Sequence, residues 1–187
     1  MKCCVKGFLY HPNKIEGSTF TTEALAFLLD KNVVTGRHTL DDVQETVNSS
    51  YVFDAIIDSL KEKITHSFLR NLHSSLMFNT TLEVEPKLDE LIEWYYNQNE
   101  ITTKVIAEFH YRFELIHPFQ DSNGRIGRFI MLKQMLENNL PIKIASWDSE
   151  DLYRSSLSSC GIGNYDPLIE YISNIKIVNI KLMQYKI

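Results

Sequence analysis

The chain has 187 residues, a length that favours one domain whose core needs neither disulfides nor metal. With 44% hydrophobic and 23% charged residues, its composition is that of an ordinary soluble protein. The formal net charge of −5 at pH 7 argues against a basic nucleic-acid-binding face, so we expect no direct nucleic-acid partner. No apolar run approaches the roughly 20 residues that span a bilayer, and no secretory signal is recognisable. We therefore expect a cytoplasmic protein with no membrane partner.

Apolar residues recur at helical spacing along the chain, and no run alternates as a strand would. The first helix is predicted to begin after Thr21, which can cap its start, and it carries Leu25 and Leu28 on one face. Thr39 begins a pattern similar to a capping box and predicts a second helix. Thr65 predicts the start of a third helix, again with apolar residues at helical spacing.

The second half of the chain is also predicted to be helical. Residues 78–85 are polar and β-prone, which predicts a loop or at most a short β-hairpin, and Pro86 suits the first turn of the next helix. A buried, central helix is predicted over residues 101–116, and another from about Asn123 to Glu137. Asp166 is predicted to cap the last helix, with a proline following it at the first helical position. These elements predict a single all-α domain.

One twelve-residue segment, His117–Arg128, reads His-Pro-Phe-Gln-Asp-Ser-Asn-Gly-Arg-Ile-Gly-Arg. Asp121, Ser122 and Asn123 are residues that turn chains and cap helices, and Gly124 removes a side chain from the same turn. Backbone N–H groups at such a helix start are unpaired and lie at the positive end of the helix dipole. The turn is therefore predicted to bind an anion.

The charged side chains of this segment match the phosphates of a nucleotide. Arg125 and Arg128 are three residues apart, so both can reach one side of the first helical turn and bind phosphate oxygens bidentately. Asp121 can hold a Mg²⁺ ion that bridges phosphate oxygens, and His117 can accept a proton near neutral pH. Together these groups predict phosphoryl or nucleotidyl transfer. The alternative is that the segment is only a turn between two helices, with surface arginines beside it.

The same segment resembles the signature of the Fic family, His-Pro-Phe-x-(Asp/Glu)-Gly-Asn-Gly-Arg-x-x-Arg. Ser122 replaces the first glycine of that signature and is the only departure from it. The resemblance extends from about Ile15 to Tyr171. It implies a Fic-like helical bundle over residues 1–187 that transfers AMP from ATP to a Ser, Thr or Tyr hydroxyl of a target protein.

The resemblance also implies roles for the first half of the segment. His117 would be the general base that deprotonates the target hydroxyl, and Phe119 would be buried and anchor the loop. Asp121 would hold Mg²⁺ against the α- and β-phosphates of ATP. The hydroxyl would attack the α-phosphorus, and pyrophosphate would leave.

In the second half of the segment, the resemblance implies that Asn123 and the backbone at Gly124 form the anion hole. Arg125 would bind the β-phosphate and Arg128 the γ-phosphate. Doc-type relatives, associated with phosphate transfer, carry lysine at the position of Gly124, so a glycine there favours AMP transfer. Ser122 belongs to the same phosphate-binding turn, and a serine would cost roughly 1–2 kcal/mol there if the position requires a positive φ.

A second segment, residues 11–18, resembles the inhibitory motif of the family, (Ser/Thr)-x-x-x-Glu-(Gly/Asn), with Pro12 at the Ser/Thr position. By this resemblance Glu16 would pair with Arg128 and leave the triphosphate misplaced for in-line attack. The alternative is that Glu16 is a surface residue beside a turn.

The resemblance leaves three functions to be separated. The first is an autoinhibited adenylyltransferase that uses ATP and Mg²⁺ to modify a target protein or itself. The second is a deAMPylase that uses the same site, and the third is a Fic module that only binds a nucleotide or a protein. Family members usually carry a β-hairpin flap that binds the target, and residues 79–85 are short for one. Relatives also form homo-oligomers or bind small antitoxin proteins, and either partner would fit this chain.

Overall fold

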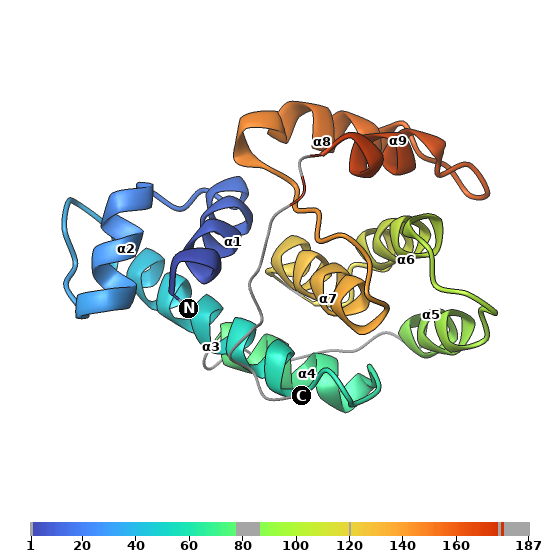
Figure 1. Ribbon diagram of the computed structural model, residues 1–187, viewed down its shortest axis with the longest axis horizontal. Helices are drawn as coiled ribbons and strands as arrows, with labels where there is room; N and C mark the ends of the chain where they lie inside the picture. Colours follow the sequence, from blue (N-terminus) through green and yellow to red (C-terminus); the bar gives the residue numbers. More distant parts are fainter. Residues whose placement is uncertain (1, 78–86, 120, 176, 178–187) are drawn as a thin grey trace.

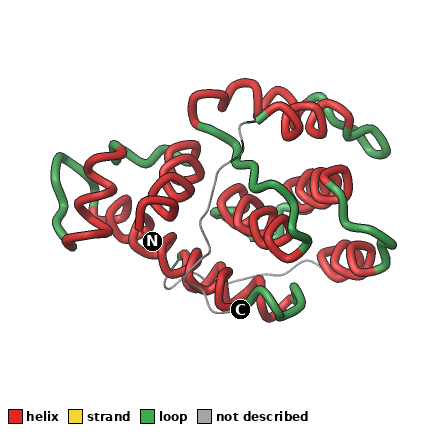
Figure 2. The backbone as a smooth tube through the Cα atoms, viewed as in Figure 1, coloured by secondary structure: helices red, strands yellow, loops and turns green. Residues whose placement is uncertain are grey.

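The computed structural model describes residues 2–77, 87–119, 121–175 and 177. In these ranges the chain forms α1 (Lys2–Ile15), α2 (Thr22–Lys31), α3 (Leu40–Asp58), α4 (His66–Leu76), α5 (Lys87–Tyr96), α6 (Thr103–Ile116), α7 (Asn123–Glu137), the short 3-10 helix η1 (Trp147–Ser149), α8 (Glu150–Ser158) and α9 (Asp166–Asn174). Figure 2 shows helices joined by loops and no strand in the described residues, which confirms the all-α prediction. The segment 78–85, for which a loop or short hairpin is predicted, lies outside the described residues. None of the described helices is both long and apolar enough to cross a bilayer.

Four threonines cap the starts of helices. The side-chain oxygens of Thr21, Thr39, Thr65 and Thr102 each accept a backbone N–H three residues further along, at 3.1 to 3.5 Å. Each bond satisfies one of the unpaired donors of a helix start and is typically worth about 1 kcal/mol. The starts predicted from the first three of these threonines are therefore confirmed.

The last helix begins one residue earlier than predicted. Asp166 is the first residue of α9 and not its cap, and the residue at the cap position, Tyr165, makes no side-chain hydrogen bond to the helix. Tyr165 is buried instead, with its ring 5.6 Å from that of Tyr111. Packing of an aromatic side chain, rather than a carboxylate cap, therefore sets where this helix starts.

No helix is predicted before Thr21, but α1 occupies 14 of the 20 residues of that segment. Pro12 lies inside this helix, and such a residue normally signals a break. The helix forms because its apolar side chains are buried in the core. The Phe8 ring lies 5.5 Å from that of Phe53 and 5.4 Å from that of Phe129. Serine-rich α8 is missed for the same reason, since its buried contacts come from tertiary packing.

Helix α7 lies in the middle of the molecule, with α6 packed beside it (Figure 1). Twelve of the 15 residues of α7 are buried, compared with five of the 14 residues of α6. The sequence predicts α6 as the central helix, but α7 is the more enclosed of the two. One apolar cluster joins both helices to the side of α1 to α5, and a second joins them to α8 and α9. Polar residues at the N-terminal end of α7 are therefore carried into the interior, where they need partners.

Candidate active site

The loop from His117 to Ser122 connects the two most closely packed helices, α6 and α7. His117 ends α6 in the left-handed conformation, with φ at 50°, and its N–H donates to the Phe113 carbonyl at 3.0 Å. The chain turns there, as the following proline predicts, and the His117 side chain is exposed. Phe119 is buried, as the resemblance implies, and its ring stacks on that of His73 at 4.1 Å.

Two side chains brace the backbone of this loop. The Asn123 Oδ1 accepts the N–H of Phe119 at 2.9 Å, and its Nδ2 donates to the carbonyl of the same residue at 2.6 Å. His73 Nε2 lies 3.0 Å from the carbonyl oxygen of Asp121, which can only accept, so Nε2 carries the proton. Burial lowers the pKa of His73, which favours this neutral form. No local pattern marks His73 as part of the site, because its contact with the loop joins residues 48 positions apart.

Ser122 precedes α7 in the left-handed conformation, with φ at 62° and ψ at 17°. The backbone strain of roughly 1–2 kcal/mol expected for a serine with a positive φ therefore applies. The side chain makes no capping bond to the helix. Its hydroxyl instead donates to the Met77 sulfur at 2.7 Å and accepts from Arg125 Nη2.

The Arg125 guanidinium is held between α3 and the start of α7. Its Nη1 donates to Glu45 Oε2 at 2.6 Å, and its Nη2 contacts both the Ser122 hydroxyl and, at 3.7 Å, the Met77 sulfur. The Arg125 side chain is only 5% exposed, whereas that of Glu45 is 35% exposed. Glu45 therefore supplies the negative charge that a buried guanidinium requires.

The Arg128 guanidinium reaches a different carboxylate. Its Nη2 donates to Glu16 Oε1, in the turn that follows α1, and to the carbonyl of Pro12 at 3.3 Å. The pairing of Glu16 with Arg128 expected from the inhibitory motif is therefore present. Gly124 leaves space for it, since a Cβ on that residue would lie 2.5 Å from Glu16 Oε1 and 3.1 Å from Arg128 Nη1.

A buried polar cluster lies behind Arg128. Tyr153 accepts from Arg128 Nη1 at 3.5 Å, and its hydroxyl lies 2.8 Å from His110 Nε2. Burial lowers the pKa of His110 to about 3 and raises that of Glu114 to about 7. Gly127 leaves space for this cluster, because a Cβ there would lie 2.5 Å from Glu114 Oε1. No sequence pattern predicts this cluster, because its polar side chains lie on otherwise apolar helix faces.

A cavity of about 270 Å³ adjoins the two arginine–carboxylate pairs and lies between the turn after α1, the start of α3 and the start of α7. Four carboxylates line it, those of Glu16, Asp41, Asp42 and Glu45, together with the single guanidinium of Arg125. So many carboxylates disfavour a phosphate group. An anion can therefore enter only when a carboxylate leaves.

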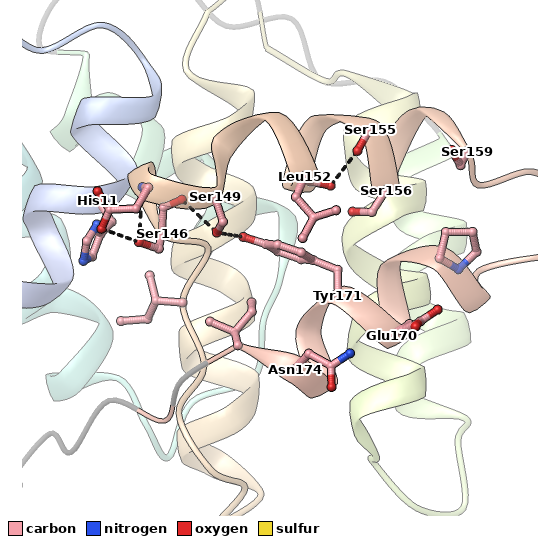
Figure 3. A pocket seen from close by; sticks show the side chains of 14 residues that line it. His11, Ser146, Ser149, Leu152, Ser155, Ser156, Ser159, Glu170, Tyr171 and Asn174 are labelled. Atoms are coloured by element: carbon pink, nitrogen blue, oxygen red, sulfur yellow. Dashed lines mark hydrogen bonds between the residues drawn. The ribbon is translucent and has the colours of Figure 1, made fainter.

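A larger cavity of about 780 Å³ lies between α1, η1, α8 and α9 (Figure 3). Its described lining includes several serines and the Tyr171 hydroxyl, which lies 2.9 Å from Ser149 Oγ. The charged groups in that lining are the carboxylates of Asp148 and Glu170, and it includes no lysine or arginine. A triphosphate needs positive charge, so this larger cavity does not suit the phosphates and the loop before α7 does.

Residues 52–135, which include the loop and both arginines, match the family model described as Fic/DOC family. Over this range the chain is similar to that family. The matched range includes the signature at residues 117–128 and also α4, which braces the loop through His73.

Curated relatives of this chain are named as adenylyltransferases. The chain is 21% identical over 195 residues to "Protein adenylyltransferase fic-1" of Caenorhabditis elegans, matching 89% of this chain and 38% of the relative. It is 25% identical over 196 residues to "Protein adenylyltransferase Fic" of Nematostella vectensis, matching 88% of this chain and 45% of the relative. The chain thus spans less than half the length of these relatives.

Solved Fic structures share the fold of this chain. A Fic domain containing signaling protein from Bacteroides thetaiotaomicron superimposes with a TM-score of 0.83 at 21% identity, covering 93% of this chain and 82% of that one. A structure of Fic-1 from C. elegans gives a TM-score of 0.79 at 20% identity, covering 91% of this chain and 59% of that one. At these identities the likeness establishes the fold.

The residues predicted for the site all lie at or beside the loop before α7, but the two arginines have different partners. Arg125 contacts Glu45 of α3, and Arg128 contacts Glu16 after α1. Among the described residues no group of three or more His, Cys, Asp or Glu side chains could enclose a metal ion. The exposed Asp121 still fits Mg²⁺, which typically takes one or two protein carboxylates and completes its shell with phosphates and water.

Proposed function

We propose that this chain transfers AMP from ATP to a hydroxyl group of a protein, either its own or that of a separate target. The observation that carries this proposal is the pair of buried arginines at the start of α7, each neutralised by a partly exposed carboxylate from a distant segment. Carboxylates held this way can be exchanged for the oxygens of a polyphosphate. The Fic signature and the names of the relatives support the same activity.

The chemistry follows from the residues around the loop. The target hydroxyl oxygen attacks the α-phosphorus and forms a new P–O bond, and the bond from that phosphorus to the bridging oxygen breaks. Pyrophosphate leaves with the bonding electrons, and His117 accepts the proton of the hydroxyl. Arg125 and Arg128 stabilise the negative charge that develops on the leaving group. Backbone N–H groups at the start of α7 orient the phosphates.

Asp121 is the residue that would hold Mg²⁺, which would neutralise charge on the α- and β-phosphates when bound. The carbonyl of Asp121 is fixed by His73, so the position of this carboxylate depends on the brace from α4.

Glu16 is proposed to inhibit the transfer. Its carboxylate occupies Arg128, the residue assigned to the γ-phosphate, and it also lines the cavity beside Arg125. While Glu16 stays there, the γ-phosphate lacks its cationic partner and the α-phosphorus is not aligned for attack. Because the Glu16 side chain is 30% exposed, it can leave the site without opening the core.

The transfer is tested by incubating the full chain with Mg²⁺ and ATP labelled on either the α- or the γ-phosphate, and measuring label on the protein. Label from the α-phosphate alone is the expected result, and it should be lost in His117→Ala. Label from the γ-phosphate would show kinase chemistry instead. Calorimetric binding of ATP without transfer of either label, in the wild type and in Glu16→Gly, would favour a module that only binds nucleotide.

Glu16→Gly should raise the rate of labelling from α-labelled ATP by roughly tenfold or more, because even 1.4 kcal/mol of competition for Arg128 corresponds to a factor of ten. Glu62→Gly is the matched control, since it removes another exposed glutamate that lies outside the helices. It should leave the rate unchanged. Equal rates in wild type and Glu16→Gly, with ATP binding intact, would remove the inhibitory role while leaving the transferase proposal standing.

A further inference from the structure

The one departure from the Fic signature, Ser122, places a hydroxyl in the phosphate-binding turn. This hydroxyl is buried and accepts a hydrogen bond from Arg125 Nη2. It donates its own proton to the sulfur of Met77, the residue that follows α4, so the hydroxyl both donates and accepts a hydrogen bond. The glycine of the family signature would offer Arg125 no such contact.

The contact from Ser122 completes the restraint on the Arg125 guanidinium. Glu45 holds Nη1 from α3, and Ser122 holds Nη2 from the start of α7. With a partner on each terminal nitrogen, the guanidinium plane is restrained against rotation about the Cδ–Nε bond. Without Ser122, the orientation would depend on the long and partly exposed Glu45 side chain and on the weak contact of Nη2 with the Met77 sulfur at 3.7 Å.

A serine at position 122 strains the backbone. With φ at 62°, the residue occupies a conformation that glycine adopts freely and serine does not. A polar contact therefore compensates for backbone strain, an arrangement typical of positions that serve a site.

We propose that Ser122 is a positioning residue that orients Arg125 toward the β-phosphate, and that it thereby gives this chain its preference for nucleoside di- and triphosphates over monophosphates. The inference rests on the proposed function, because it assumes that Arg125 meets the β-phosphate. It goes beyond that function by assigning a task to the residue that departs from the family signature.

The test measures binding of ADP and AMP in the presence of Mg²⁺ by titration calorimetry, for the wild type, Ser122→Gly and Ser122→Ala. Both variants should bind ADP roughly fivefold to tenfold more weakly, since a hydrogen bond to a charged group is lost. Both should bind AMP as the wild type does, because AMP has no β-phosphate.

A thermal melt separates this role from a general loss of structure. Ser122→Gly relieves the strain of the left-handed backbone and Ser122→Ala does not, so Ser122→Gly should melt about 2–4 °C higher than Ser122→Ala. The two variants should nevertheless share the same loss of ADP affinity.

Three results would count against the inference. Wild-type ADP affinity in Ser122→Gly would show that the hydroxyl does not position Arg125, and an equal loss of AMP affinity would show a general structural effect. Either of these two results would leave the proposed transferase activity standing. Failure of the wild type to bind either nucleotide would overturn the proposed function, and this inference with it.

Discussion

The two ends of α7 both bury positive charge, but they neutralise it in different ways. At the C-terminal end, Lys133 is fully buried and donates to the Ser59 carbonyl, while its Nζ lies 2.7 Å from Glu137, one turn further along the same helix. At the N-terminal end, Arg125 and Arg128 pair with carboxylates 80 and 112 residues away in the sequence. The Nε atoms of both arginines are buried without a hydrogen-bond partner in the described part of the chain.

This difference separates a structural charge from one available to a ligand. The partners of Lys133 are Glu137 of its own helix and the carbonyl and hydroxyl of Ser59, and the Glu137 side chain is only 17% exposed. The carboxylates that meet the arginines are 30% and 35% exposed and come from other segments of the fold, the turn after α1 and helix α3. A buried charge pair is therefore a better sign of a binding site when its counter-charge is accessible and comes from elsewhere in the fold.

The largest expected effect is on the rate of AMP transfer, and it comes from a residue beside the N-terminal end of α7. His117→Asn should lower the rate of AMP transfer by 10²- to 10⁴-fold, the usual loss when a general base is removed. Asparagine tolerates the left-handed backbone at this position, so the melting temperature should stay within about 2 °C of the wild type. Single-turnover labelling measures the rate of transfer, and scanning calorimetry measures the melting temperature. A rate within about threefold of the wild type would exclude His117 as the base.

At the C-terminal end, Lys133→Ala should lower the free energy of unfolding by about 3 kcal/mol, because it leaves the Glu137 carboxylate without its buried partner. Affinity for ADP should not change. Lys133→Met is the control, since it fills the same space without a charge and should recover part of the loss. Urea denaturation measures the stability. A drop in ADP affinity comparable to that of an Arg125 variant would contradict the division between the two ends.

A smaller effect is expected from the carboxylate of Glu114, behind Arg128. Burial raises its pKa from 4.5 to about 7, so the folded state favours the protonated form and stability is lost as pH rises from about 4.5 to 7. Burial of His110 acts in the opposite direction, since its lowered pKa costs stability as pH falls below 6.5. Glu114→Gln removes the pH dependence that comes from Glu114 and leaves that of His110 unchanged.

The measurement for Glu114 is the free energy of unfolding of wild type and Glu114→Gln across this pH range. The difference in favour of the variant should grow with pH by up to roughly 3 kcal/mol and level off above pH 7. A constant difference would show that the Glu114 carboxylate does not titrate in a buried site.

Local signals were enough to predict part of this structure. Thr21, Thr39 and Thr65 each precede a run of helical apolar spacing, and each caps a helix because a side-chain oxygen can reach the unpaired N–H groups of the next turn. The segment at residues 117–128 also carries its turn residues in order, so the bend between α6 and α7 follows from local chemistry. The pairing of Glu16 with Arg128 could be anticipated only through the resemblance to the family.

Other features depend on contacts between distant residues. Helix α1 contains a proline and gains its stability from Phe8 in the core, which no local pattern reveals. Glu45 has no neighbours in sequence that mark it as the partner of Arg125. His73 braces the loop only because α4 packs beside the loop before α7.

By itself, the order of residues determined an all-helical fold and the chemical groups of the turn before α7, because caps, turns and helical spacing act over a few residues. Only the tertiary structure decided which carboxylate meets each arginine and what Ser122 contacts. Those contacts depend on how α1, α3 and α4 enclose the start of α7. Burial there makes every unpaired charge costly, and so selects partners from distant parts of the chain.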